Sequence, residues 1–110
     1  MADVFDLLEA ELLDERHWIA IQELCELVQL DLATIVELAE QGVVAPRGVR
    51  PAEWFLPAAA MPRLRLASRL MHDLGVNVSG AVLAVELLES RRALEQQLRL
   101  LEDLLGERRD

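Results

Sequence analysis

Apolar residues recur at helical intervals in the first quarter of the chain. Val4, Leu8 and Leu12 stand four residues apart with acids between them, which predicts a short amphipathic helix or a loosely docked arm. Residues 17–21 form a brief run of bulky side chains that is compatible with a β-strand. Residues 22–28 then return to helical spacing, so a second helix is expected directly after this run.

Another helical run follows, and both of its ends carry local signals. Asp31 can cap the helix by accepting a backbone hydrogen bond in the first turn. Gly42 can end it in the left-handed conformation that glycine adopts at low cost. Two short helices over residues 22–28 and 32–41, joined by a tight turn, predict a helix-turn-helix.

The pattern changes after Gly42. Residues 43–51 and 52–56 are two β-compatible runs with a bend rich in Pro and Gly, and we expect them to form a small wing. Proline is tolerated only in the first turn of a helix, so the third helix should begin at Pro62. Gly75 should end that helix.

A long final helix is predicted after Asn77 or Ser79, either of which can cap it, with a length of about 25 to 30 residues. Its leucines follow the steps of four and three that mark a coiled-coil seam: Leu87, Leu94, Leu98, Leu101 and Leu105. Arg91 occupies one seam position. The seam predicts a homodimer, and the alternative is a monomer in which Leu88, Leu100 and Leu104 widen the stripe enough to dock on the chain's own core.

These patterns divide the 110 residues into three parts. They are an acidic N-terminal extension over 1–16, a winged helix-turn-helix body over 17–78, and a C-terminal dimerisation helix over 79–110. The fold class is mainly α with a small β wing. The length fits one small domain and excludes an enzyme with separate cofactor and substrate lobes.

Charge is distributed unevenly along the chain. The net charge is -9, and residues 1–45 hold eleven acids with Arg16 as the single base. An acidic surface disfavours phosphate backbones and anionic lipid and favours a basic partner. The bases of the middle segment are all arginines whose role the sequence leaves open: Arg47, Arg50, Arg63, Arg65 and Arg69.

The residues available for chemistry are few. The chain has no Lys or Tyr, and His17 and His72 stand far apart, so we expect no enzyme, no metal site and no cofactor. Cys25 is the single cysteine, which excludes an internal disulfide and favours an inert buried thiol. No apolar stretch is long enough to cross a bilayer, and the N-terminus lacks the basic start of a signal peptide, which predicts a cytoplasmic protein without a membrane partner.

Three stretches carry a family resemblance: residues 35–46 (IVELAEQGVVAP), 53–56 (EWFL) and 69–74 (RLMHDL). Together with the order of predicted elements, they make the chain similar to MerR-type regulators and, most closely, to the chaperone-modulator family of CbpM-like proteins. The resemblance implies a MerR-like winged helix-turn-helix that binds the J-domain of a DnaJ-like co-chaperone and inhibits its stimulation of Hsp70.

The residues of the two short helices support the same interpretation. A DNA-reading helix needs bases near phosphates, whereas residues 31–41 carry three acids and no base, so DNA binding by this helix is disfavoured. J-domains present a basic helix to Hsp70, and an acidic surface can compete for it. The candidate partner-binding residues are Glu23, Glu26, Asp31, Glu37, Glu40 and Trp54.

Other interpretations stay open. The carboxylates can simply be the solvated face of amphipathic helices, and Trp54 can serve only to pack the wing. The alternative function is a MerR-type DNA-binding transcription regulator, which the five arginines of the wing and third helix favour. A third is a coiled-coil adaptor without client specificity.

Overall fold

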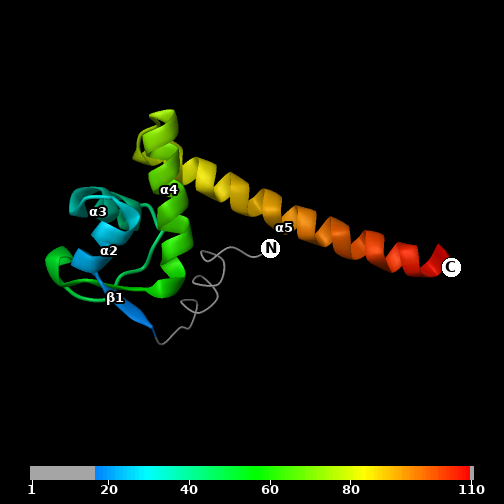
Figure 1. Ribbon diagram of the computed structural model, residues 1–110, viewed down its shortest axis with the longest axis horizontal. Coiled ribbons are helices and arrows are strands. Elements are labelled where there is room, and N and C mark those ends of the chain that lie inside the picture. The colour runs from blue at the N-terminus through cyan, green and yellow to red at the C-terminus, as the bar shows by residue number, and fades with distance from the viewer. Residues whose placement is uncertain (1–16, 110) are drawn as a thin grey trace.

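The first part of the described structure is a helix-turn-helix. The computed structural model describes residues 17–109, so the helix or arm expected within residues 1–16 lies outside the described residues. β1 (Trp18–Ala20) leads directly into α2 (Ile21–Val28), and α3 (Leu32–Glu40) follows after a short turn. Figure 1 shows the two short helices together on one side of the body, as the sequence predicts.

Local hydrogen bonds explain the turn between α2 and α3. Gln29 follows α2 in the left-handed conformation with a φ of 57°, and the N–H of Leu30 donates to the Cys25 carbonyl at 3.2 Å. The Asp31 carboxylate then accepts a 2.8 Å hydrogen bond from the backbone N–H of Thr34. This bond satisfies one donor of the first turn of α3 and confirms the predicted N-cap.

Glycines end two helices of the body at the predicted positions. Gly42 lies just beyond α3 with a φ of 83°. Gly75, with a φ of 67°, directly follows α4 (Met61–Leu74), and its N–H donates to the Met71 carbonyl at 3.1 Å. Pro62 lies in the first turn of α4, where the missing N–H of a proline costs no intrahelical hydrogen bond. The helix begins at Met61, one residue before the predicted start.

The small sheet is paired differently from the expectation. β2 (Phe55–Pro57) runs antiparallel to β1, with Trp18 opposite Pro57. The two runs 43–51 and 52–56 were expected to form the wing by themselves. They pair at a single bridge only, and the partner strand of β2 instead precedes α2.

Residues 47–55, which we call the wing, form a turn rather than a hairpin of two strands. Arg47 and Phe55 exchange both backbone hydrogen bonds at 2.9 Å, but the pairing stops at this single bridge. The chain bends at Gly48, which has a φ of 122°, and continues into the 3-10 helix η1 (Pro51–Glu53). A proline cannot donate to a strand ladder and a positive φ breaks the pleat, so this segment cannot continue as a strand.

The core lies between α2, α3, α4 and the first turns of the last helix. Its largest fully buried side chains are Ile21, Leu24, Ile35, Leu38, Leu56, Leu64 and Val85. Burying a side chain of this size contributes about 1.5–3 kcal/mol relative to leaving it exposed. η2 (Ala58–Ala60) joins β2 to α4, and the N–H of Ala58 donates to the His17 carbonyl at 2.9 Å. The point where the chain enters β1 therefore lies beside the start of α4.

The last helix, α5 (Val78–Arg109), has 32 residues and is slightly longer than expected. Of the two candidate caps, Asn77 acts: its side-chain oxygen accepts a 2.8 Å hydrogen bond from the N–H of Gly80. Val85 is fully buried in the body, whereas every described side chain from 86 to 106 is exposed. Figure 1 shows this part of α5 projecting away from the body as a single helix.

The leucines of the projecting part remain exposed in the single chain. The five seam leucines have exposed fractions between 53% and 65%: Leu87, Leu94, Leu98, Leu101 and Leu105. Leu88, Leu100 and Leu104 are exposed as well, which contradicts the alternative that they dock α5 on the chain's own core. Among residues 17–109, no helix combines the length and hydropathy that a membrane crossing requires.

Candidate functional site

Carboxylates occupy the outer faces of α2 and α3. Glu23 and Glu26 are exposed and stand one turn apart on α2, on the side away from the buried Leu24. Glu37 and Glu40 repeat the arrangement on α3. The core takes the apolar positions of each helix, and residues three apart on the remaining face are neighbours, so the acids form pairs. The structure thus places four of the predicted contact residues on two adjoining helices.

Asp31 joins this surface but also serves the fold. It lies in the turn between α2 and α3 and is exposed. Hydrogen bonding to Thr34 holds the pKa of the Asp31 carboxyl below its usual value, so the group is charged under ordinary conditions. Its negative charge also stands at the N-terminal end of α3, where the helix dipole favours it. We call the exposed faces of Glu23, Glu26, Asp31, Glu37 and Glu40 the acidic face.

Trp54 packs the wing against the body. Its side chain is half-buried against the core, and its carbonyl accepts a 2.9 Å hydrogen bond from the N–H of Ile21 at the start of α2. Its neighbour Phe55 is the more accessible aromatic residue, with an exposed fraction of 47%. Phe55 was not among the predicted contact residues. The alternation of β2 would have found it, because Leu56 points into the core and its neighbour must point outward.

Two of the five arginines are engaged in contacts that hold elements together. The guanidinium of Arg63 donates to both carboxylate oxygens of Glu89, at 2.7 and 2.8 Å, and to the Val43 carbonyl at 2.6 Å. It therefore ties α4 to both α5 and the segment after α3. The guanidinium of Arg47 lies 4.1 Å from the ring centre of Trp18, a cation–π contact between the wing and β1.

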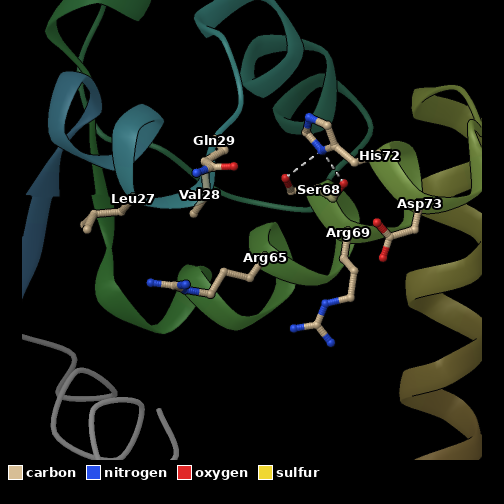
Figure 2. A pocket seen from close by; sticks show the side chains of 8 residues that line it. All are labelled: Leu27, Val28, Gln29, Arg65, Ser68, Arg69, His72 and Asp73. Carbon is tan, nitrogen blue, oxygen red and sulfur yellow. Dashed lines mark hydrogen bonds between the residues drawn. The ribbon is translucent and has the colours of Figure 1, made fainter. Parts of the chain in front are cut away.

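Two other arginines line a groove between the end of α2 and the outer face of α4. The groove has a volume of about 290 Å³ and is lined by Leu27, Val28, Gln29, Arg65, Ser68, Arg69, His72 and Asp73. Figure 2 shows Arg65 extending from α4 toward the Leu27 side and Arg69 projecting from the next turn. Leu27 is 41% exposed. We call this feature the arginine groove; no local pattern in the sequence indicates it, because it depends on α2 packing beside α4.

The histidine of the groove is held by its own helix. His72 Nδ1 lies 2.7 Å from the Ser68 carbonyl oxygen and 3.2 Å from the Ser68 hydroxyl oxygen, contacts that Figure 2 draws as dashed lines. Ser68 itself is buried. These contacts fix the orientation of the imidazole ring at the edge of the arginine groove.

The remaining titratable residues form no reactive cluster. Cys25 is half-buried, and burial, followed by the nearby charge of Asp31, raises the pKa of its thiol, which keeps the sulfur protonated. His17 is exposed at the start of β1. Within the described residues 17–109, no three His, Cys, Asp or Glu side chains are placed to hold a metal ion.

Comparisons with known proteins agree on the kind of protein that this chain resembles. The family model of MerR HTH family regulatory proteins matches residues 19–103. A chaperone modulatory protein CbpM of Coxiella burnetii is 34% identical over 82 residues, which cover 74% of this chain and 77% of that protein. Proteins of the same name from Pseudomonas entomophila and Pseudomonas putida are each 31% identical over 86 residues, 78% of this chain and 85% of theirs. No solved structure matches the chain significantly.

These names describe regulators and modulators, which are non-enzymatic kinds of protein. The matched region runs from β1 far into α5, so it includes the acidic face, the wing and the arginine groove. It leaves out residues 1–16, and the acidic extension is thus not part of the family match.

Proposed function

Because the chain belongs to the MerR-type helix-turn-helix family and, within it, to the chaperone modulatory proteins, we propose that it binds a J-domain. The J-domain is that of a DnaJ-like co-chaperone, and binding inhibits the stimulation of Hsp70 by that co-chaperone. The names of the relatives support a chaperone-modulating role. The J-domain as target, the homodimer and the cytoplasmic location are parts of the proposal.

One observation carries this proposal further than the names do. In a helix-turn-helix protein that reads DNA, the second helix enters the major groove. Here that helix is α3, which exposes Glu37 and Glu40 and has no Lys or Arg from Asp31 to Gln41. DNA phosphates would repel this surface, whereas a basic helix of a J-domain would be attracted to it.

Binding then combines two contributions. The acidic face steers the basic partner toward α2 and α3 and so raises the association rate. Two apolar side chains are exposed on the same body, Leu27 on α2 and Phe55 on β2. Burying their apolar surface in the complex slows dissociation and so lengthens the lifetime of the complex. A J-domain covered in this way cannot present its basic helix to Hsp70, so inhibition needs no chemical step.

The direct test measures association with the purified J-domain by stopped-flow fluorescence. The double variant Glu37→Lys with Glu40→Lys should slow association sharply, because it reverses two of the five charges of the acidic face. Single Glu→Gln variants should change the rate only a few-fold, since one exposed ion pair contributes about 0.2–1 kcal/mol.

The matched control is Glu86→Lys with Asp103→Lys, which makes the same change in net charge at two exposed positions of α5. This control should retain most of the wild-type association rate. Circular dichroism checks that both variants are folded. Equal slowing in the two variants would mean that net charge alone acts, and an unchanged rate in Glu37→Lys with Glu40→Lys would move the contact surface away from α3.

Inhibition is measured separately from binding. The ATPase rate of Hsp70, stimulated by the co-chaperone, should return to the unstimulated rate as this protein is added in excess over the J-domain. Failure of the wild-type protein to bind any J-domain would refute the proposal and leave the DNA-binding regulator and the coiled-coil adaptor as the remaining interpretations.

DNA binding is the alternative function, and the arginines of the wing and α4 favour it. Arg50 and Arg69 are exposed, as phosphate contacts would require. Arg63, in contrast, is engaged with Glu89 and Val43. A gel-shift titration across salt concentrations separates the functions, because phosphate contacts give a steep loss of affinity with salt and a protein specific for J-domains gives no shift.

We further propose that α5 forms a homodimer. The seam leucines of this helix leave an apolar stripe in water when the chain is alone, interrupted at Arg91, and pairing with a second copy would bury it. A two-fold dimer would carry two acidic faces, one on each body.

A further inference from the structure

Arg69 is exposed on α4 and lines the arginine groove together with Leu27 of α2. Within the described residues 17–109, its guanidinium makes no hydrogen bond or ion pair. Asp73 stands one turn further along α4, but Figure 2 shows the two charged groups apart. Arg65 differs, because it already has an interaction partner and its charge is engaged. Of the two arginines that line the groove, Arg69 is therefore the one that offers a charge to a ligand.

The arginine groove and the acidic face share a border on α2. Glu23 and Leu27 stand four residues apart on this helix, so they are neighbours on one ridge with about 5–6 Å between their Cβ atoms. Glu26 directly precedes Leu27, which is 41% exposed at the edge of the groove. A ligand that lies across this ridge meets carboxylates on one side of Leu27 and Arg69 on the other.

The opposite charges on the two sides of the ridge distinguish between basic partners. A partner that is basic throughout is attracted by the glutamates and repelled by Arg69, because like charges brought together in an interface disfavour that complex. A partner with a carboxylate beside its basic residues is attracted on both sides. The planar guanidinium of an arginine can donate two parallel hydrogen bonds to such a carboxylate. Leu27 lies between the two sides and can exclude water from the contact.

We propose that Arg69 is a specificity-determining residue of the partner-binding surface. It binds a carboxylate that the partner carries beside its basic helix, and it rejects partners that are basic throughout. The acidic face then attracts basic partners in general, and Arg69 selects among them. This inference rests on the proposed function, in which the partner is a J-domain.

The test compares two probes whose affinities should change in opposite directions. The purified J-domain and an oligolysine peptide each carry a fluorescent label, and fluorescence anisotropy measures their binding. Arg69→Glu should weaken J-domain binding by on the order of 10-fold, because an ion pair is replaced by a pair of like charges. The same variant should bind oligolysine several-fold more tightly, because the protein becomes more acidic beside its acidic face.

The matched control is Arg99→Glu, which makes the same change in net charge at an exposed position on the projecting part of α5. This control should bind the J-domain at least as tightly as wild type does. Arg69→Gln should weaken J-domain binding a few-fold without placing a second acid beside Asp73, and circular dichroism checks that each variant is folded. Equal J-domain affinities of Arg69→Glu and Arg99→Glu, or oligolysine binding that Arg69→Glu leaves unchanged, would overturn the inference. A wild-type protein that binds oligolysine but no J-domain would instead refute the proposed function.

Charge reversal on the partner identifies the carboxylate that Arg69 binds. The Asp and Glu residues that flank the basic helix of the J-domain are changed to Lys one at a time. One of these J-domain variants should bind wild-type protein more weakly and Arg69→Glu more tightly than the unchanged J-domain does. Arg99→Glu should show no such rescue, because its new charge lies outside the contact. If no J-domain variant rescues Arg69→Glu more than Arg99→Glu, the proposed pairing with a partner carboxylate is wrong.

Discussion

Asp31 belongs both to the acidic face and to the fold, since its exposed carboxylate caps α3. Asp31→Ala should lower the melting temperature, because the N–H of Thr34 loses its acceptor in the first turn of the helix. Asp31→Asn should retain most of the stability, because an asparagine side chain caps equally well. Thermal unfolding by circular dichroism measures both, and equal losses in the two variants would contradict the capping role.

The same residue predicts a dependence of stability on pH. The pKa of Asp31 is lower in the folded chain than its usual value, so the charged form favours folding. This stabilisation is complete above the usual pKa of an aspartate and is lost as the pH falls through the lowered value. The difference in melting temperature between wild type and Asp31→Ala should therefore shrink in acid, and a difference that is constant with pH would argue against it.

Arg63 is one of the arginines that favour DNA binding in the sequence, but in the structure its guanidinium holds α4 to neighbouring elements. Arg63→Ala removes the hydrogen bond to the part-buried Val43 carbonyl as well as the ion pair with Glu89. Hydrogen bonds to charged groups contribute about 1.5–3 kcal/mol, whereas exposed ion pairs contribute about 0.2–1 kcal/mol. Arg63→Ala should thus lower the free energy of unfolding in urea by more than Glu89→Ala does, and equal effects would assign all of the stabilisation to the ion pair.

At the scale of elements, the sequence predicted what local signals determine. The Asp31 cap, the glycines after α3 and α4, and the proline in the first turn of α4 act within one helical turn, so the boundaries of these helices were nearly correct. The pairing of β1 with β2 joins residues 18–20 to residues 55–57, and no local pattern indicates it. For that reason the wing was expected to pair within itself.

The features of the candidate site also divide into those that local sequence patterns predict and those that depend on tertiary packing. Exposure of the four glutamates of the acidic face followed from helical spacing, because an acid opposite an apolar stripe must face water, whereas Asp31 lies in the turn before α3. The arginine groove and the buried contacts of Arg63 depend on which helices pack together, so they were visible only in the structure. The division at residue 78 stays a prediction, and the buried Val85 shows that the start of α5 contributes to the core of the body.

The projecting part of α5 makes the clearest prediction for a single element. Leu98→Glu with Leu101→Glu places two charges in the proposed seam and should convert the proposed dimer into monomers in sedimentation experiments at micromolar concentrations. Gln96→Glu with Gln97→Glu adds the same charge at positions outside the five-leucine seam and should leave the dimer largely intact. A wild-type chain that already sediments as a monomer would show that the stripe has another use.

At the scale of the whole molecule, charge is separated between surfaces. The acidic face lies on α2 and α3, whereas the arginines of the middle segment lie on the wing and α4. The net charge of -9 adds a long-range attraction for any basic partner. A basic partner approaching from solution would thus be drawn toward the chain before any contact forms, and in the proposed complex the acidic face would determine which side it meets.

This separation predicts how the proposed binding to a J-domain responds to salt. Screening shortens the range of the attraction from about 30 Å at 0.01 M to about 3 Å at 1 M ionic strength, so the association rate should fall by on the order of 10-fold or more over this range. The dissociation rate should change much less, because the proposed apolar contacts at Leu27 and Phe55 are not screened. In Glu37→Lys with Glu40→Lys the association rate should depend only weakly on salt. A wild-type complex in which salt acts mainly on dissociation would place the charges inside the interface rather than around it.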